Sequence, residues 1–150
     1  MKVKLWETPE GFWDSEFIAA LLGGALFWLV LWLFIPGRTL SLQGLLTRHF
    51  LALVLEWPLL EELAFRGILQ GQLYQFDWAR AHWHGVTRAN LITTVLFTAA
   101  HLWNHSVPWA LAVFVPSLIF GYFRDRTLSV YPAIVLHIYY NLGYFLVTGI

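Results

Sequence analysis

The chain alternates between long apolar segments and short polar connections. Its pattern of side chains gives five apolar segments, at residues 17–35, about 50–69, about 91–103, about 107–123 and about 130–148. A helix that spans the bilayer core needs about 20 apolar residues. The first segment reaches this length without a charged residue, whereas the third is short. The pattern therefore predicts an all-α, multipass helical bundle with about five membrane spans.

Prolines and charges predict where these helices bend and end. Pro58 lies inside the second segment and predicts a kink or local break, while Pro132 falls in the first turn of the fifth, where proline is tolerated. Residues 71–90 form the longest and most polar connection. Arg124, Asp125 and Arg126 predict a tight turn between the last two helices.

Composition agrees with a membrane setting. Of the 150 residues, 59% are hydrophobic and 12% are charged, against about 25% charged in soluble domains. The nine Trp and twelve Phe suit aromatic belts at the membrane interfaces. The absence of cysteine from the sequence excludes a disulfide framework, a thiol nucleophile and a Cys-based zinc site. The formal net charge of zero gives no reason to expect nucleic acid as a partner.

The flanks of the first segment bear on its fate and orientation. We do not expect a cleaved signal peptide, because the apolar run is long and follows Asp14 and Glu16 rather than basic residues. If all five segments span, one side of the membrane carries more basic residues than the other. The richer side has Lys2, Lys4, Arg80, Arg88, Arg124 and Arg126, and the other has Arg38 and Arg48. This excess predicts a cytoplasmic N-terminus.

A cluster of three charged residues within six positions of the second segment, Glu61, Glu62 and Arg66, points to a function other than spanning. Each such group near the bilayer centre costs roughly 2.5–3.5 kcal/mol on insertion scales. Glu62 and Arg66 are four apart and can pair on one helix face, whereas Glu61 points about 100° away from Glu62. The spacing predicts a structural ion pair for Glu62 with Arg66 and leaves Glu61 as a candidate general base. Alternatively, both acids lie solvated at the membrane boundary.

Polar residues also occur in the third and fifth segments. His101 follows three small residues, and His137 and Asn141 share one face of the last helix. A histidine N–H and an asparagine amide aimed at one point could stabilise an oxyanion. Hydrogen bonds that only pack helices together would explain each set separately. The occurrence of polar groups with helical spacing on three apolar segments favours a catalytic site within the membrane.

The remaining ionisable residues carry no assigned chemistry. His82 and His84 are two apart in the polar connection and read as ordinary loop histidines, as do His49 and His105. Glu56 lies within the second segment, and the sequence suggests no partner for it.

The three polar clusters together resemble the CPBP family, which contains type II CAAX prenyl proteases and bacteriocin-processing or immunity proteins and is also called ABI. Its motifs are two glutamates, three residues and an arginine; a phenylalanine, three residues and a histidine; and a histidine, three residues and an asparagine. They correspond to Glu61–Arg66, Phe97–His101 and His137–Asn141, in that order. The resemblance covers about residues 45–145. It implies an N-terminal segment over residues 1–44 and a protease core over 45–150.

The resemblance implies a role for each motif residue. Glu61 and His101 would activate a water for attack on a peptide carbonyl, and His137 and Asn141 would form the oxyanion hole. Glu62 and Arg66 would hold the site in place. The family has been described both as glutamic proteases and as metalloproteases, and Glu61, His101 and His137 could ligate zinc. Because Asn141 is a poor zinc ligand and a good oxyanion donor, we expect no cofactor.

The resemblance also implies an intramembrane endopeptidase of the bacterial inner membrane. Its partners would be membrane lipids and a membrane-anchored protein or peptide, cleaved in a tail or a leader. The alternative is a non-proteolytic immunity or scaffold protein of the same family, in which the motifs serve packing. A channel or transporter subunit would also explain intramembrane polar residues, but five short helices leave little room for repeat-based transport.

Overall fold

A computed structural model describes residues 12–34 and 47–149, and most of them are helical. The helical elements up to the polar connection are α1 (Ser15–Phe34), α3 (Arg48–Leu51), η1 (Ala52–Glu56), α4 (Trp57–Glu62), η2 (Leu63–Leu69) and α5 (Gln70–Leu73). The later elements are α6 (Asp77–Arg80), β1 (His82–Trp83), β2 (Val86–Thr87), α7 (Arg88–His101), α8 (Val107–Ala112), α9 (Phe114–Thr127) and α10 (Tyr131–Thr148).

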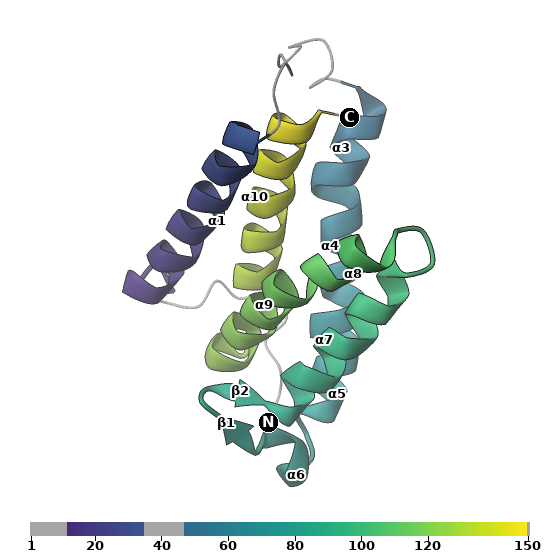
Figure 1. Cartoon of the computed structure of the whole chain (residues 1–150). Coiled ribbons are helices and arrows are strands. Elements are labelled where there is room, and N and C mark those ends of the chain that lie inside the picture. Colours follow the sequence, from purple (N-terminus) through teal and green to yellow (C-terminus); the bar gives the residue numbers. More distant parts are fainter. Residues whose placement is uncertain (1–11, 35–46, 150) are drawn as a thin grey trace.

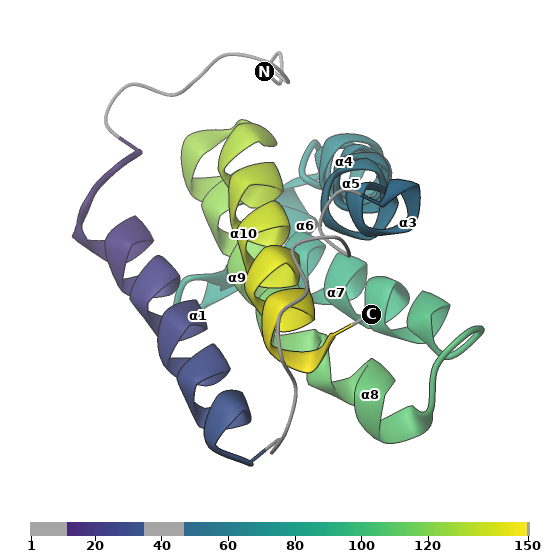
Figure 2. The ribbon, with the colours of Figure 1, turned by 90° about the horizontal axis from the view of Figure 1, so that it is seen from above.

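The long helices traverse the molecule in alternating directions. In Figure 1, α1, α7 and α10 run one way, and the helix over residues 48–73 and α9 run the other. α10 packs against α1, α9, α4 and η1, and α9 also packs against α7. Seen from above in Figure 2, α10 lies between α1 and the helix over residues 48–73. α10 therefore brings the third motif against the helix that carries the first.

The helix over residues 48–73 is continuous, although it contains Pro58. α3 passes into η1, α4, η2 and α5 with right-handed helical backbone angles at each junction. η1 and η2 are π-helical, with hydrogen bonds that reach five residues back, and such turns often occur at functional sites. Pro58 is the second residue of α4, which follows η1 directly. The predicted local break is therefore a change of helix type.

One expectation about the connections is wrong, and the polar connection contains an element that the sequence did not predict. Arg124, Asp125 and Arg126 belong to α9, and the chain turns after them at Leu128, which has a left-handed φ of 55°. The polar connection also contains a short antiparallel hairpin of β1 and β2, two residues each, within a fold that is otherwise mostly helical. His84 and Gly85 form its turn with φ of 48° and 81°. Two residues with positive φ suit a tight hairpin, which a helical hydrophobic pattern cannot reveal.

Two described helical stretches are long and apolar enough to cross a membrane by length and composition. They are Ser15–Phe34, with mean hydropathy 2.4, and Val107–Thr127, with mean hydropathy 1.4. α1 exposes several large apolar side chains, among them Leu22, Leu26 and Leu33. α7 has 14 residues, too few for a full span. The five-span arrangement thus stays a prediction, as does the orientation, because Lys2, Lys4 and Arg38 lie outside the described residues.

Close packing of α1 on α10 depends on a glycine. A Cβ added at Gly143 would lie 2.0 Å from a ring atom of Trp28, whereas one added at Gly23 on α1 would meet nothing within 4 Å. Small residues allow helices to approach closely in membranes. We expect Gly143→Ala to lower the free energy of unfolding by about 1–3 kcal/mol, because the rigid indole of Trp28 must move.

Gly23→Ala is the matched control, since it adds the same methyl group to a helix with open space around it. It should leave stability unchanged or raise it slightly. Thermal unfolding in detergent measures both variants, and equal shifts would contradict this account of the α1–α10 contact.

Candidate active site

The predicted ion pair between Glu62 and Arg66 is present and buried. Arg66 Nη1 donates to Glu62 Oε1 over 3.0 Å, and both side chains are fully buried. Arg66 Nη2 donates to the backbone oxygen of Ser117 over 3.0 Å and to its hydroxyl over 2.6 Å. The guanidinium also lies 4.5 Å from the centre of the Phe97 ring, a cation–π distance. Contacts from three directions thus hold Arg66.

His137 lies between the two glutamates. Its Nδ1 is 2.8 Å from Glu62 Oε1, and its Nε2 is 3.7 Å from Glu61 Oε2. Because Oε1 of Glu62 also accepts from Arg66, it acts as a carboxylate acceptor and Nδ1 of His137 carries a proton. The 3.7 Å separation at Nε2 is too long for a direct hydrogen bond.

Glu61 differs from Glu62 in its surroundings, as the 100° offset predicts. The Glu61 side chain is 28% exposed, whereas that of Glu62 is fully buried. Glu61 has no partner closer than His137 in the part of the chain that the structure describes. It therefore combines a free carboxylate with access from outside the bundle.

His101 ends α7, one turn after Phe97. Its Nδ1 is 2.9 Å from the Phe97 backbone oxygen, so Nδ1 donates and Nε2 keeps its lone pair. The Phe97 ring lies 4.5 Å from the His101 ring and 6.0 Å from the His137 ring. Phe97 therefore brings the two histidines to one region. Among the described residues, no hydrogen bond joins His101 to Glu61 or His137 directly.

Asn141 occupies a place that Pro58 creates. In a π-helical turn the carbonyl of Leu53 would accept from the N–H of residue 58, but proline has none. Asn141 Nδ2 instead donates to the Leu53 oxygen over 3.0 Å. Since an amide group has two N–H donors, one remains for another acceptor. Asn141 thus ties α10 to η1 and keeps a donor on the face it shares with His137.

Glu56 has a partner that the sequence did not suggest. Arg48 Nη2 donates to Glu56 Oε2 over 3.2 Å, and both side chains are substantially exposed. His105 also proves to have neighbours. Its ring stacks on Trp109 at 3.9 Å and lies 5.9 Å from that of His101.

No group of three or more His, Asp and Glu side chains in the described part of the chain is placed to hold a metal ion. Glu61, His101 and His137 therefore do not form a ready ligand set in this arrangement. The residues do not fit the zinc alternative without movement of at least one of them.

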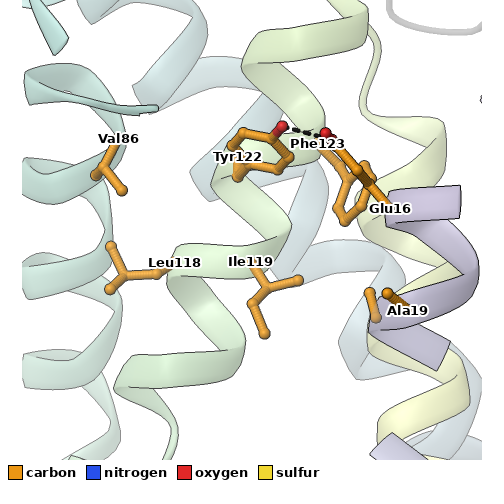
Figure 3. Close-up of a pocket in the computed structure, with 8 residues that line it drawn as sticks. Glu16, Ala19, Val86, Leu118, Ile119, Tyr122 and Phe123 are labelled. Carbon is orange, nitrogen blue, oxygen red and sulfur yellow. Dashed lines mark hydrogen bonds between the residues drawn. The ribbon is translucent and has the colours of Figure 1, made fainter. Parts of the chain in front are cut away.

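An open groove of about 450 Å³ lies elsewhere, between α1, α9 and β2 (Figure 3). Its walls are mostly apolar, and at one end the Tyr122 hydroxyl donates to Glu16 over 2.6 Å. None of the predicted site residues lines it. The groove is therefore separate from the candidate active site.

The sequence did not reveal the contacts that cross between helices. Helical spacing identified Glu62 with Arg66 because both lie on one helix. It could not identify the contact of Glu62 with His137, or that of Arg66 with Ser117. Each of these contacts joins two helices, and the spacing within one helix does not determine how it is aligned with another. A polar serine at the position of Ser117 inside an apolar segment was the available signal.

Comparisons with known proteins place the chain in a family. No curated protein and no solved structure matched it. A family model described as type II CAAX prenyl endopeptidase Rce1-like matched residues 43–143, which is more than half of the chain and includes all three motifs. The chain therefore belongs to the Rce1-like family of type II CAAX prenyl endopeptidases.

Proposed function

We propose that this protein is an intramembrane endopeptidase that hydrolyses a peptide bond in the tail or leader of a membrane-anchored protein. The family is one of proteases, and the two long apolar helices together with the family indicate a membrane protein. The observation that carries the proposal is the placement of His137 between the buried Glu62 and the partly exposed Glu61. A purely structural ion pair would not need the second carboxylate.

Glu61 acts as the general base in this proposal. Its carboxylate takes a proton from a water bound beside it, and the hydroxide oxygen attacks the peptide carbonyl carbon. His101, with its free Nε2, assists in orienting that water. The proton on Glu61 then passes to the leaving amine, and the carbon–nitrogen bond breaks.

The oxyanion that forms is held by Asn141 and His137. Asn141 supplies the amide N–H that Leu53 leaves available. For His137 to donate through Nε2, its ring must be protonated on both nitrogens. Nδ1–H then continues to donate to Glu62. Glu62 and Arg66 set the position of the ring.

The proposed function also includes a membrane topology. We propose five passes with a cytoplasmic N-terminus in a bacterial inner membrane. The alternating directions of α1, the helix over residues 48–73, α7, α9 and α10 support this arrangement (Figure 1). The pass through α7 would use its flanking residues to reach across the membrane.

Cleavage of a membrane-anchored peptide by the purified protein tests the proposal. Metal-free chemistry predicts that a chelator changes the rate little and that Asn141→Ala lowers kcat by about a hundred- to a thousandfold, because one oxyanion donor is lost. The change should fall on kcat rather than on KM.

A zinc enzyme would give the opposite order. Chelation would then abolish activity, zinc would restore it, and Asn141→Ala would matter less than His137→Ala. Metal analysis of the same sample completes the comparison, and one zinc per active chain would overturn the metal-free proposal. If the folded protein cleaves no anchored peptide of a varied panel, the non-proteolytic immunity or scaffold function is favoured.

A further inference from the structure

A row of buried polar side chains leads away from the ion pair into α9 and α7. Ser117 on α9 and Thr94 and Asn90 on α7 are all fully buried. Burial of a polar group is costly unless it is hydrogen-bonded. Three such residues on two neighbouring helices therefore indicate a connected network rather than separate accidents of packing.

The hydrogen bonds of this row run in one direction. Arg66 Nη2 donates to Ser117 Oγ over 2.6 Å, and Ser117 Oγ donates to Thr94 Oγ1 over 3.1 Å. Thr94 Oγ1 in turn donates to Asn90 Oδ1 over 3.2 Å. Each hydroxyl accepts one hydrogen bond and donates one. Chains of this kind polarise one another, so each bond is stronger than it would be alone.

The far end of the row is fixed by backbone. Asn90 Nδ2 donates to the Leu118 oxygen over 3.0 Å. A Cβ added at Gly121 would lie 1.9 Å from Asn90 Oδ1, so the approach of α9 to Asn90 requires a glycine there. The amide therefore has a defined orientation, and its Oδ1 is presented to Thr94.

The near end of the row reaches the candidate active site. Arg66 Nη1 holds Glu62 Oε1 at 3.0 Å, and the same oxygen is 2.8 Å from Nδ1 of His137. The position of His137 thus depends on Glu62, and that of Glu62 depends on Arg66. Partners beyond the reacting groups commonly fix ring orientation and tautomer in this way.

We propose that Ser117 and Thr94 are positioning residues for His137, which they orient through Arg66 and Glu62. The inference rests on the proposed function, since it assigns these hydroxyls to the same site. Without the hydroxyl of Thr94, that of Ser117 loses its acceptor and turns, and the guanidinium then shifts. The hydrogen bond from Nδ1–H of His137 to Glu62 then no longer has one fixed geometry.

Three substitutions on one helix test this role. Thr94→Val removes the hydroxyl with little change of shape, and Thr94→Ser keeps it. Thr93 is equally buried, but its hydroxyl has no hydrogen-bond partner in the described part of the chain, so Thr93→Val is the matched control. We expect Thr94→Val to lower kcat about tenfold with KM unchanged, and Thr94→Ser and Thr93→Val to stay near wild type.

A spectroscopic readout separates this inference from the proposed function. The ¹⁵N shifts of the His137 ring, assigned with His137→Gln in the full-length protein, report which nitrogen carries a proton. Wild type and Thr93→Val should show protonated Nδ1, and Thr94→Val should show an altered or mixed state. If Thr94→Val fails to fold, Ser117→Ala takes its place in both measurements.

The outcomes are distinct. If wild type cleaves and the Thr94→Val variant matches Thr93→Val in both kcat and ring shifts, the positioning role is overturned while the protease function stands. If wild type cleaves nothing, the protease function fails, and the ring shifts alone decide whether the row orients His137.

Discussion

Glu61→Gln is expected to abolish peptide cleavage while leaving the protein folded. The substitution keeps the size of the side chain but removes the group that takes a proton from water. Positioned general bases contribute about a hundred- to ten-thousandfold to rate. The variant should therefore be slower than wild type by about this factor or more. Glu61 is 28% exposed and accepts no hydrogen bond from Arg66, so its loss strands no buried charge. Thermal unfolding should therefore resemble that of wild type.

Glu56→Gln is the matched control. Glu56 is an exposed acid on the same continuous helix, and its partner is the exposed Arg48. It should keep full activity, because the ion-pair partner of Glu56 among the described residues is Arg48 and not a residue of the candidate site. Cleavage of an anchored peptide and thermal unfolding are measured on both variants. Full activity of Glu61→Gln would show that Glu61 is not the base.

The sequence predicted the elements of the fold better than their connections. Hydrophobic segments located α1, α7, α9 and α10 because a helix buries or exposes a continuous apolar face. They could not place the end of α9, because Arg124 is fully buried and paired with Asp125 rather than solvated in a turn. Three adjacent charged residues are typical of a loop, and the sequence did not show the ion pairs that hold Arg124 and Arg126 within the fold.

In the site, too, contacts within one helix could be predicted from the sequence, whereas contacts between helices could not. The pairing of Glu62 with Arg66 follows from a spacing of four, and the structure contains it. The contact of Asn141 with Leu53 depends on a carbonyl that Pro58 leaves without a donor, on a different helix. Only the packing of α10 on η1 brings the two together. Helical periodicity therefore identifies which residues share a face, but not what that face meets.

Arg66→Ala is expected to reduce the folded yield severely. Glu62 is fully buried and would remain as a carboxylate with only the neighbouring His137 beside it. Breaking a buried pair by removal of one partner costs about 3–5 kcal/mol. Typical domains are stable by about 5–15 kcal/mol, so this loss would remove a large share of the total. Arg66→Ala also leaves the Ser117 hydroxyl without its donor, which adds to the cost.

An exposed pair of similar spacing provides the control. Arg80 pairs with Asp77 three residues earlier, and the two side chains are 41% and 92% exposed. Arg80→Ala should cost less than about 1 kcal/mol, because solvent screens the pair. Monodisperse yield in detergent and thermal unfolding compare the two variants. Equal losses would show that burial of the Glu62 pair carries no special weight.

The double variant Glu62→Gln with Arg66→Met separates stranded charge from loss of geometry. It removes both charges together, and replacement of a buried pair by uncharged groups is often neutral. Folded yield should then recover well above that of Arg66→Ala. Activity should stay low, because His137 has lost the carboxylate that accepts its Nδ1 proton. Recovery of both yield and full turnover would mean that the pair only supports the fold, and that His137 needs no carboxylate to hold it in place.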